Sequence, residues 1–243
     1  KKNLLFLDKP WLMPPLVVNL IRIDAKLMNI ELGLNRKVRR AYGIDEIALV
    51  PGNRTLDYDL TDPSWSIGDF KREVPIVASA MDSVVDVNTA VELTKLGSLG
   101  VINMEGIQTR YENPDEILNQ IASVGKNDFV PLMQNIYSEP VREELILQRI
   151  NEVKEKGGIA AFSGTPQAAI KFKETLNNSK IDLFFLQGTV VSTEHLGKEG
   201  NETLNISDLC KSMRVPIIAG NCVTYDVAKL LMQAGVAGLM VGI

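Results

Sequence analysis

Short apolar runs alternate with amphipathic segments from about residue 74 onward. The runs are apolar at consecutive positions, which is typical of parallel strands that are buried on both faces. Segments with helical periodicity separate them, and this rhythm predicts an α/β fold built from β/α units. The predicted strands are Val74 to Ser79, Leu99 to Asn103, Ile159 to Ser163, Leu183 to Gln187, Val215 to Gly220 and Gly238 to Ile243, with Phe129 to Met133 as a weaker seventh.

Start and stop signals frame the helices between these strands. Asn113 can cap a helix that has Pro114 at its first position and ends at Gly125. The same reasoning places helices after Pro140, with Ile146, Ile150 and Val153 on one face, after Thr165 and after Thr224.

Two architectures fit this rhythm, an open doubly wound sheet and a closed eight-stranded barrel. A dinucleotide-binding open sheet should carry G-x-G-x-x-G after its first strand, and no such run follows any predicted strand. The pattern therefore favours a (β/α)8 TIM barrel. In a barrel, functional side chains lie where strands end, so the polar residues at those points are the candidates.

The first predicted strand ends at Ser79, and Met81 and Asp82 follow it. A flat heteroaromatic ligand could pack on Met81 while Ser79 hydrogen-bonds its polar part. The structural alternative is that Asp82 caps the next helix, Met81 fills core and Ser79 bonds backbone. Residue types alone favour this alternative.

Two later strands also end in polar residues. Gln187, Gly188 and Thr189 follow one of them, and Asn221 follows another. Asn221 can donate to and accept from a substrate heteroatom without carrying charge, or it can brace the turn before Thr224. Both readings of Asn221 stay open.

The chain offers little support for other chemistry. Cys222 has no base or cation beside it in sequence, which favours a buried, inert thiol. His195 is the only histidine, so we expect a surface or supporting role and no metal cluster around it.

Composition narrows the setting. The net charge of -4 and the interspersed charges argue against a nucleic-acid partner. With only Cys210 and Cys222, and no apolar stretch long enough for a membrane, we expect a cytoplasmic protein with free thiols.

A set of motifs in a fixed order is more specific than any one of them. Residues 28–243 resemble the IMP dehydrogenase and GMP reductase family, within it the bacterial IMP dehydrogenase-related branch without CBS domains. The segment from Val124 to Gly158 is too short to hold such domains. The motifs are Tyr42 to Gly52, Pro75 to Val84, Gly97 to Asn103, Gly220 to Thr224, Ala234 to Val236 and Val241 to Ile243.

The resemblance implies an enzyme of purine nucleotide metabolism and GMP biosynthesis. It would bind IMP or GMP together with NAD or NADP and transfer hydride at C2 of the purine. Ser79 and Met81 would contact the nucleotide and Asn221 would support catalysis beside the ring. Contacts with the cofactor would come from Gln187, Gly188, Thr189, Gly242 and Ile243. IMP dehydrogenase is slightly favoured because Ser79 to Asp82 resembles its motif, GMP reductase is the alternative, and a non-catalytic nucleotide-binding or assembly barrel is the rival of another class.

Two departures qualify this implication. Gln187 stands where the family usually has Asp. The family's catalytic cysteine, its potassium-binding loop and its later phosphate-binding strands would follow Ile243. We therefore expect an incomplete and inactive barrel in this chain, with no metal ligands in it, and potassium and a homotetramer only in the complete protein.

Residues 1–27 precede the resemblance and the chain opens on Lys1. We predict that they are an in-frame extension and that the natural protein starts at Met28. Mass spectrometry of the natural N-terminus tests this, and an N-terminal peptide from upstream of Met28 would disprove it.

Overall fold

The computed structural model describes residues 29–31, 37–39, 44–48, 50, 52–53, 56–68, 70–188, 194–196 and 203–242. The chain divides into two compact units, one up to Asp62 and one from Pro63. The first contains the antiparallel pair β1 (Asn29–Glu31) and β2 (Lys37–Arg39) and the 3-10 turns η1 (Ile44–Glu46) and η2 (Tyr58–Leu60). The predicted extension, residues 1–27, lies outside the described residues.

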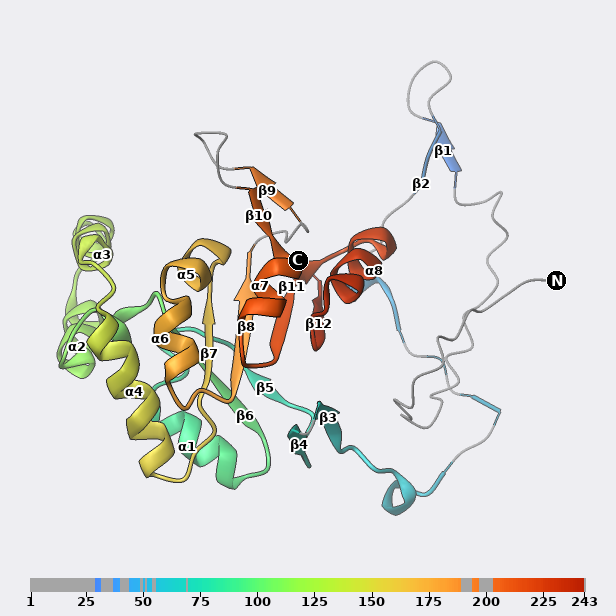
Figure 1. The fold of residues 1–243 in the computed structure, drawn as a ribbon, viewed down its shortest axis with the longest axis horizontal. Helices are drawn as coiled ribbons and strands as arrows, with labels where there is room; N and C mark the ends of the chain where they lie inside the picture. The colour runs from blue at the N-terminus through green and yellow to red at the C-terminus, as the bar shows by residue number, and fades with distance from the viewer. Residues whose placement is uncertain are drawn as a thin grey trace. The chain divides into compact units, whose positions relative to one another are not determined.

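A parallel six-stranded sheet forms the centre of the second unit (Figure 1). Its strands pair in chain order, whereas a doubly wound sheet reverses its order at a switch point. The curled sheet is therefore part of a TIM barrel, which confirms the predicted fold class. The strands are β5 (Val77–Ala78), β6 (Leu99–Asn103), β7 (Ala161–Gly164), β8 (Leu183–Gln187), β11 (Ile217–Cys222) and β12 (Gly238–Val241).

Helices cover the outer face of this sheet. Apolar residues of α1, α4, α5, α6, α7 and α8 pack into one core cluster with the outward-facing strand residues. A hairpin of β9 (Glu194–Leu196) and β10 (Thr203–Asn205) lies between β8 and α7 in the chain. The helices are α1 (Val87–Lys95), α2 (Pro114–Ser123), α3 (Phe129–Ser138), α4 (Glu143–Glu155), α5 (Pro166–Lys171), α6 (Lys173–Asn178), α7 (Ile206–Ser212) and α8 (Tyr225–Ala234), with the 3-10 turn η3 (Ile107–Thr109) after β6.

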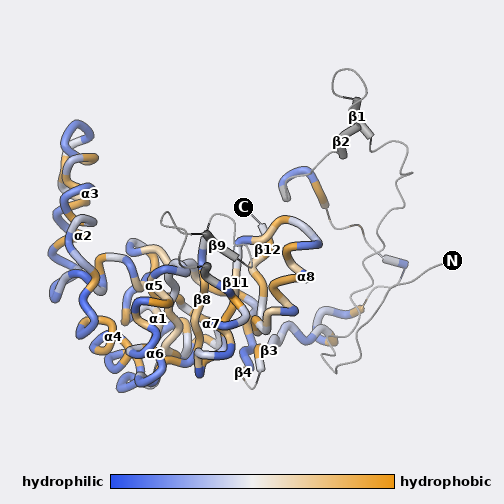
Figure 2. Tube along the Cα trace, turned by 45° about the horizontal axis from the view of Figure 1, so that its top comes forward, coloured by the Kyte–Doolittle hydropathy of each residue, from blue (hydrophilic) through white to orange (hydrophobic). Residues whose placement is uncertain are grey.

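Successive strand residues enter two different cores. In β8, Phe184 and Leu186 belong to the cluster on the helix side, whereas Leu183 and Phe185 belong to a second cluster on the inner face. Alternation of side chains along a strand produces this division. Both faces of β8 are thus apolar up to Leu186, and Figure 2 shows hydrophobic colour along most of this strand.

A short antiparallel hairpin covers the inner face. It consists of β3 (Trp65–Ile67) and β4 (Phe70–Arg72), and Trp65, Ile67 and Phe70 pack against the inner cluster. The Trp65 indole Nε1 donates to the carbonyl oxygen of Val74 at 2.8 Å, which fixes the hairpin just before β5. The sequence patterns above did not predict this hairpin.

Several local predictions are confirmed. The bounds of β6 and β8 are those predicted, and β5 is shorter than the predicted Val74 to Ser79. Thr165 and Thr224 cap their helices by accepting from Ala168 N and Val227 N, at 3.2 and 3.3 Å.

Other local predictions are wrong. Residues 129–133 form the start of helix α3, not a strand. Phe129, Met133 and the buried Ile136 follow helical spacing, and Pro131 lies in the first turn, where a helix tolerates proline. The helix predicted from Pro140 begins at Glu143, because Arg142 is still extended. Asn113 makes no side-chain capping bond and donates instead to Glu116 at 3.3 Å.

The two-sided core predicts a large cost for truncating a central strand residue. Phe162 of β7 is fully buried on the helix side, so Phe162→Ala should lower the free energy of unfolding by about 3 to 5 kcal/mol. Urea denaturation measures this change. Ile170→Ala on α5, where the side chain is 46% exposed, is the control and should change stability by less than about 1 kcal/mol. Equal effects of the two substitutions would contradict the assignment of Phe162 to the core.

Candidate functional site

Polar side chains collect at the carboxyl ends of the parallel strands. Alternation carries the inner face of β6 from Leu99 to Asn103 and that of β8 from Leu183 to Gln187. Asn103 is directly opposite Ser163 of β7 in the register. The inner face at the carboxyl ends of the strands, which is the mouth of the barrel, therefore carries Asn103, Ser163 and Gln187. Sequence reasoning gave no role to Asn103 or Ser163, although counting alternate positions from Leu99 would have identified Asn103.

The ends of β8 and β11 form one backbone unit. Gln187 is opposite Gly220 in the register, Gly188 N donates to Gly220 O at 2.9 Å, and Asn221 N donates to Gly188 O at 3.0 Å. These bonds bring the half-buried side chains of Gln187 and Asn221 to adjacent strand ends. The predicted cofactor residues Gln187 and Gly188 thus lie beside the predicted catalytic residue Asn221.

Strand β12 approaches β11 closely at the same level. A Cβ atom on Gly220 would lie 2.5 Å from Met240 Cβ, so only glycine fits between these strands. Gly242 N donates to Cys222 O at 3.1 Å, which holds Gly242 against the residue that follows Asn221. The predicted residues Thr189 and Ile243 lie outside the described residues.

The predicted nucleotide residues Ser79 and Met81 follow β5 in a tight turn. Met81 N donates to Ser79 O at 2.8 Å, and Val84 N donates to Met81 O at 2.9 Å. Ser79 is exposed and Met81 is 52% exposed, so Met81 is not a core residue. Strands β6 and β7 separate this turn from β8, and their ends carry Asn103 and Ser163.

Asp82 does not cap the helix that follows it. The capping residue of α1 is Asp86, whose Oδ1 accepts from Thr89 N at 2.7 Å. Asp82 uses both carboxylate oxygens in long-range bonds: Oδ1 accepts from Ile107 N at 3.0 Å and Oδ2 from the Tyr137 hydroxyl at 2.5 Å. Asp82 therefore links the turn after β5 to η3 and to α3.

Tyr137 keeps its proton in this position. Burial, and then the hydrogen bond to Asp82, raise the pKa of the Tyr137 phenol well above its ordinary value of 10.0. The phenol thus remains a hydrogen-bond donor to Asp82 throughout the neutral range. The Arg110 guanidinium lies 5.6 Å from the centroid of the Tyr137 ring, a cation–π distance.

Glu105 connects the next two strand ends. Its carboxylate accepts from Thr165 N at 2.6 Å and from the Thr165 hydroxyl at 3.2 Å. Its backbone N donates to Asn103 Oδ1 at 3.0 Å, which orients the Asn103 amide. The loops after β6 and β7 are therefore joined by side-chain bonds.

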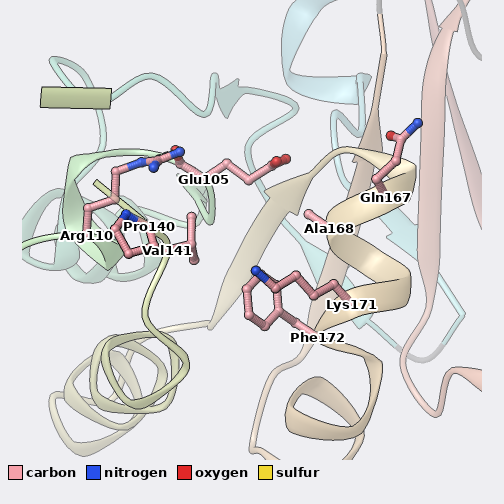
Figure 3. A pocket seen from close by; sticks show the side chains of 8 residues that line it. All are labelled: Glu105, Arg110, Pro140, Val141, Gln167, Ala168, Lys171 and Phe172. Carbon is pink, nitrogen blue, oxygen red and sulfur yellow. Dashed lines mark hydrogen bonds between the residues drawn. The ribbon is translucent and has the colours of Figure 1, made fainter. Parts of the chain in front are cut away.

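A pocket of about 300 Å³ opens between the loop after β6, the segment that precedes α4, and α5 (Figure 3). Figure 3 shows Glu105 and Arg110 on one side of it and Lys171 and Phe172 on the other. None of the predicted site residues lines it. The lining residues are Glu105, Arg110, Pro140, Val141, Gln167, Ala168, Lys171 and Phe172.

The two cysteines are not placed for nucleophilic attack at the mouth. Cys222 is buried in the cluster on the helix side, in agreement with the inert thiol predicted from sequence. Burial raises the pKa of the Cys210 thiol, which favours its protonated form.

Among the described helices, none combines the length and apolar character that a membrane crossing requires.

Comparison with known proteins yields one consistent similarity. Residues 41–243 match the model of the IMP dehydrogenase / GMP reductase domain. An uncharacterized oxidoreductase of Mycolicibacterium smegmatis is 31% identical over 88% of this chain and 58% of its own length. Inosine-5'-monophosphate dehydrogenase of Methanocaldococcus jannaschii is 33% identical over 43% of this chain and 20% of its own length.

A solved structure supports the same similarity. The crystal structure of an IMP dehydrogenase/GMP reductase-like protein from Corynebacterium glutamicum superposes with a TM-score of 0.81 and 29% identity. The match covers 89% of this chain and 58% of that protein. The chain thus spans less than two thirds of the length of the M. smegmatis and C. glutamicum proteins.

The Asp82 bridge predicts a specific steric effect. A Cβ atom on Gly106 would lie 1.9 Å from Asp82 Oδ1, so Gly106→Ala must displace the carboxylate from Ile107 N. Because a hydrogen bond to a charged group is lost, the free energy of unfolding should fall by about 1.5 to 3 kcal/mol in urea denaturation. Gly125→Ala is the matched control, since a Cβ there meets nothing within 4 Å. A Gly106→Ala protein as stable as the control would refute the bridge.

Proposed function

The chain belongs to the IMP dehydrogenase / GMP reductase family, and on that basis we propose that the protein carrying it is a purine nucleotide oxidoreductase. It would transfer hydride between C2 of a purine nucleoside monophosphate and NAD or NADP. Oxidation of IMP to XMP is the favoured direction. In that reaction IMP loses hydride from C2 and gains the oxygen of water there, with release of a proton.

One observation carries the proposal. Neutral side chains that both donate and accept hydrogen bonds occur at successive strand ends on one edge of the sheet, namely the half-buried Asn103, Gln187 and Asn221, with the buried Ser163 between the first two. A purine base and a carboxamide each present mixed donors and acceptors. Such side chains can hold these groups without placing a charge beside the reacting carbon.

Each predicted residue then has a definite role. Met81, which is half exposed beside the tight turn at Ser79, would pack on the face of the purine ring. The Ser79 hydroxyl would bond a polar atom of the nucleotide, and Asn221 would orient the ring near C2. Because Cys222 is buried and Cys210 favours its protonated form, neither would act as the nucleophile.

The residues present fit a nicotinamide group. Gln187 and Asn221 carry amides at adjacent strand ends, and an amide matches the donors and acceptors of a carboxamide. When bound, the dinucleotide supplies the hydride acceptor. The contribution of this chain is to hold and orient it, and the neutral Gln187 would do so without the negative charge of an aspartate.

The choice between the two family reactions rests on few residues. Ser79 to Asp82 resembles the IMP dehydrogenase motif, and the relative from M. jannaschii carries that name. The short segment between α2 and β7 leaves no room for CBS domains. This feature supports GMP reductase, which is the second candidate.

Cofactor absorbance tests the proposal in the natural protein. With IMP and NAD, we expect the absorbance of the reduced cofactor to rise. A loss of absorbance with GMP and NADPH would instead establish GMP reductase, and no change with either pair would support a non-catalytic barrel.

The 243-residue chain alone should bind IMP weakly or not at all, and nanomolar affinity in calorimetry would contradict this expectation.

Met81→Ala separates the nucleotide site from general stability. Loss of the contact between the thioether and the purine ring should cost about 1.4 kcal/mol of nucleotide binding. The KM for the nucleotide should therefore rise roughly tenfold. Met232→Ala is the control, since Met232 lies 64% exposed on α8. An unchanged KM in the Met81 variant would remove Met81 from the site.

A further inference from the structure

Helix α3 contacts the turn that carries the predicted nucleotide residues. The Tyr137 hydroxyl near its end donates to Asp82 Oδ2 at 2.5 Å, across 55 positions in the chain. Asp82 directly follows Met81, which is 52% exposed. A residue in the connection between β6 and β7 is therefore hydrogen-bonded to the turn after β5.

The end of α3 is itself held in place. The Tyr111 hydroxyl donates to Ile136 O at 3.0 Å, and Arg110 Nη1 donates to Glu139 O. Arg110 also donates through Nε to Glu105 O at 3.0 Å and lies over the Tyr137 ring. The phenol thus projects from a fixed base and not from a free helix end.

The turn after β5 has two such external bonds through Asp82. One comes from Ile107 N at 3.0 Å, at a point where Gly106 leaves no space for a side chain, and the other comes from Tyr137. The two bonds use different carboxylate oxygens, so together they fix both the position and the rotation of the Asp82 side chain. Loss of either bond leaves rotation about the other.

We propose that Tyr137 is a positioning residue for the purine nucleotide: through Asp82 it holds Ser79 and Met81 in the arrangement that receives the base. This inference rests on the proposed function. It follows from preorganisation, since a turn that is already ordered does not lose conformational freedom when the ligand binds. Helix α3 thereby contributes to nucleotide affinity without touching the nucleotide.

Kinetics of Tyr137→Phe in the natural full-length protein test the inference. The KM for the nucleotide should rise roughly tenfold, as expected for a lost bond to a charged group, while kcat changes less than about twofold. A merely structural role would lower the melting temperature or the folded fraction and leave the KM unchanged. Tyr225→Phe, which removes a 79% exposed phenol on α8, is the matched control.

A second measurement reads the turn directly and needs no nucleotide. In protein labelled with ¹³C-methyl methionine, the Met81 signal, assigned through Met81→Leu, should shift or broaden in Tyr137→Phe and stay unchanged in Tyr225→Phe. Asp82→Asn weakens the same bond from its other end. The effect of the double variant should therefore be smaller than the sum of the two single effects.

The outcomes separate the two proposals. An unchanged Met81 signal, or an unchanged nucleotide KM, in a folded Tyr137→Phe protein overturns the positioning role. Additive effects of Tyr137→Phe and Asp82→Asn overturn it as well. If the natural protein binds and converts no nucleotide while the Met81 signal still shifts, the proposed function fails and the control of the turn by Tyr137 stands.

Discussion

Burial of the parallel sheet on both faces is the constraint on which the described structure depends. Parallel strands leave no face for water, so every second residue must pack against helices and the residues between them against another apolar layer. Here the helices form the first layer, and Trp65, Ile67 and Phe70 of the β3–β4 hairpin cover the second. This two-sided packing fixes which strand residues face inward, and so which polar side chains appear at the mouth.

Sequence patterns predicted the sheet well because its strands are local and strongly apolar. Leu99–Asn103 and Leu183–Gln187 have the predicted bounds, since each follows a polar residue and stays free of polar side chains until its last position. The segment at Phe129 was misread because a short apolar run does not distinguish a buried strand from one face of a helix. The length of α3, which continues to Ser138, distinguishes them.

The candidate site was only partly predictable for a different reason. Ser79, Gln187 and Asn221 could be named from their positions at strand ends, and the structure places them there. Asn103 follows from counting alternate positions from Leu99, whereas Ser163 required the register between β6 and β7, which a single sequence does not give. The bond between Asp82 and Tyr137 joins residues far apart in the chain, so local capping rules assigned Asp82 to the wrong partner.

The hairpin that covers the inner face also carries a fluorescent probe of that side of the sheet. Trp65 packs against the inner cluster and donates its indole N–H to Val74 O, whereas the second tryptophan of the chain, Trp11, lies outside the described residues. In a protein with Phe in place of Trp11, fluorescence emission would report on the inner layer alone. Loss of helix signal in circular dichroism follows the outer layer, so the two spectroscopies together can resolve whether both layers of the half-barrel form in one step.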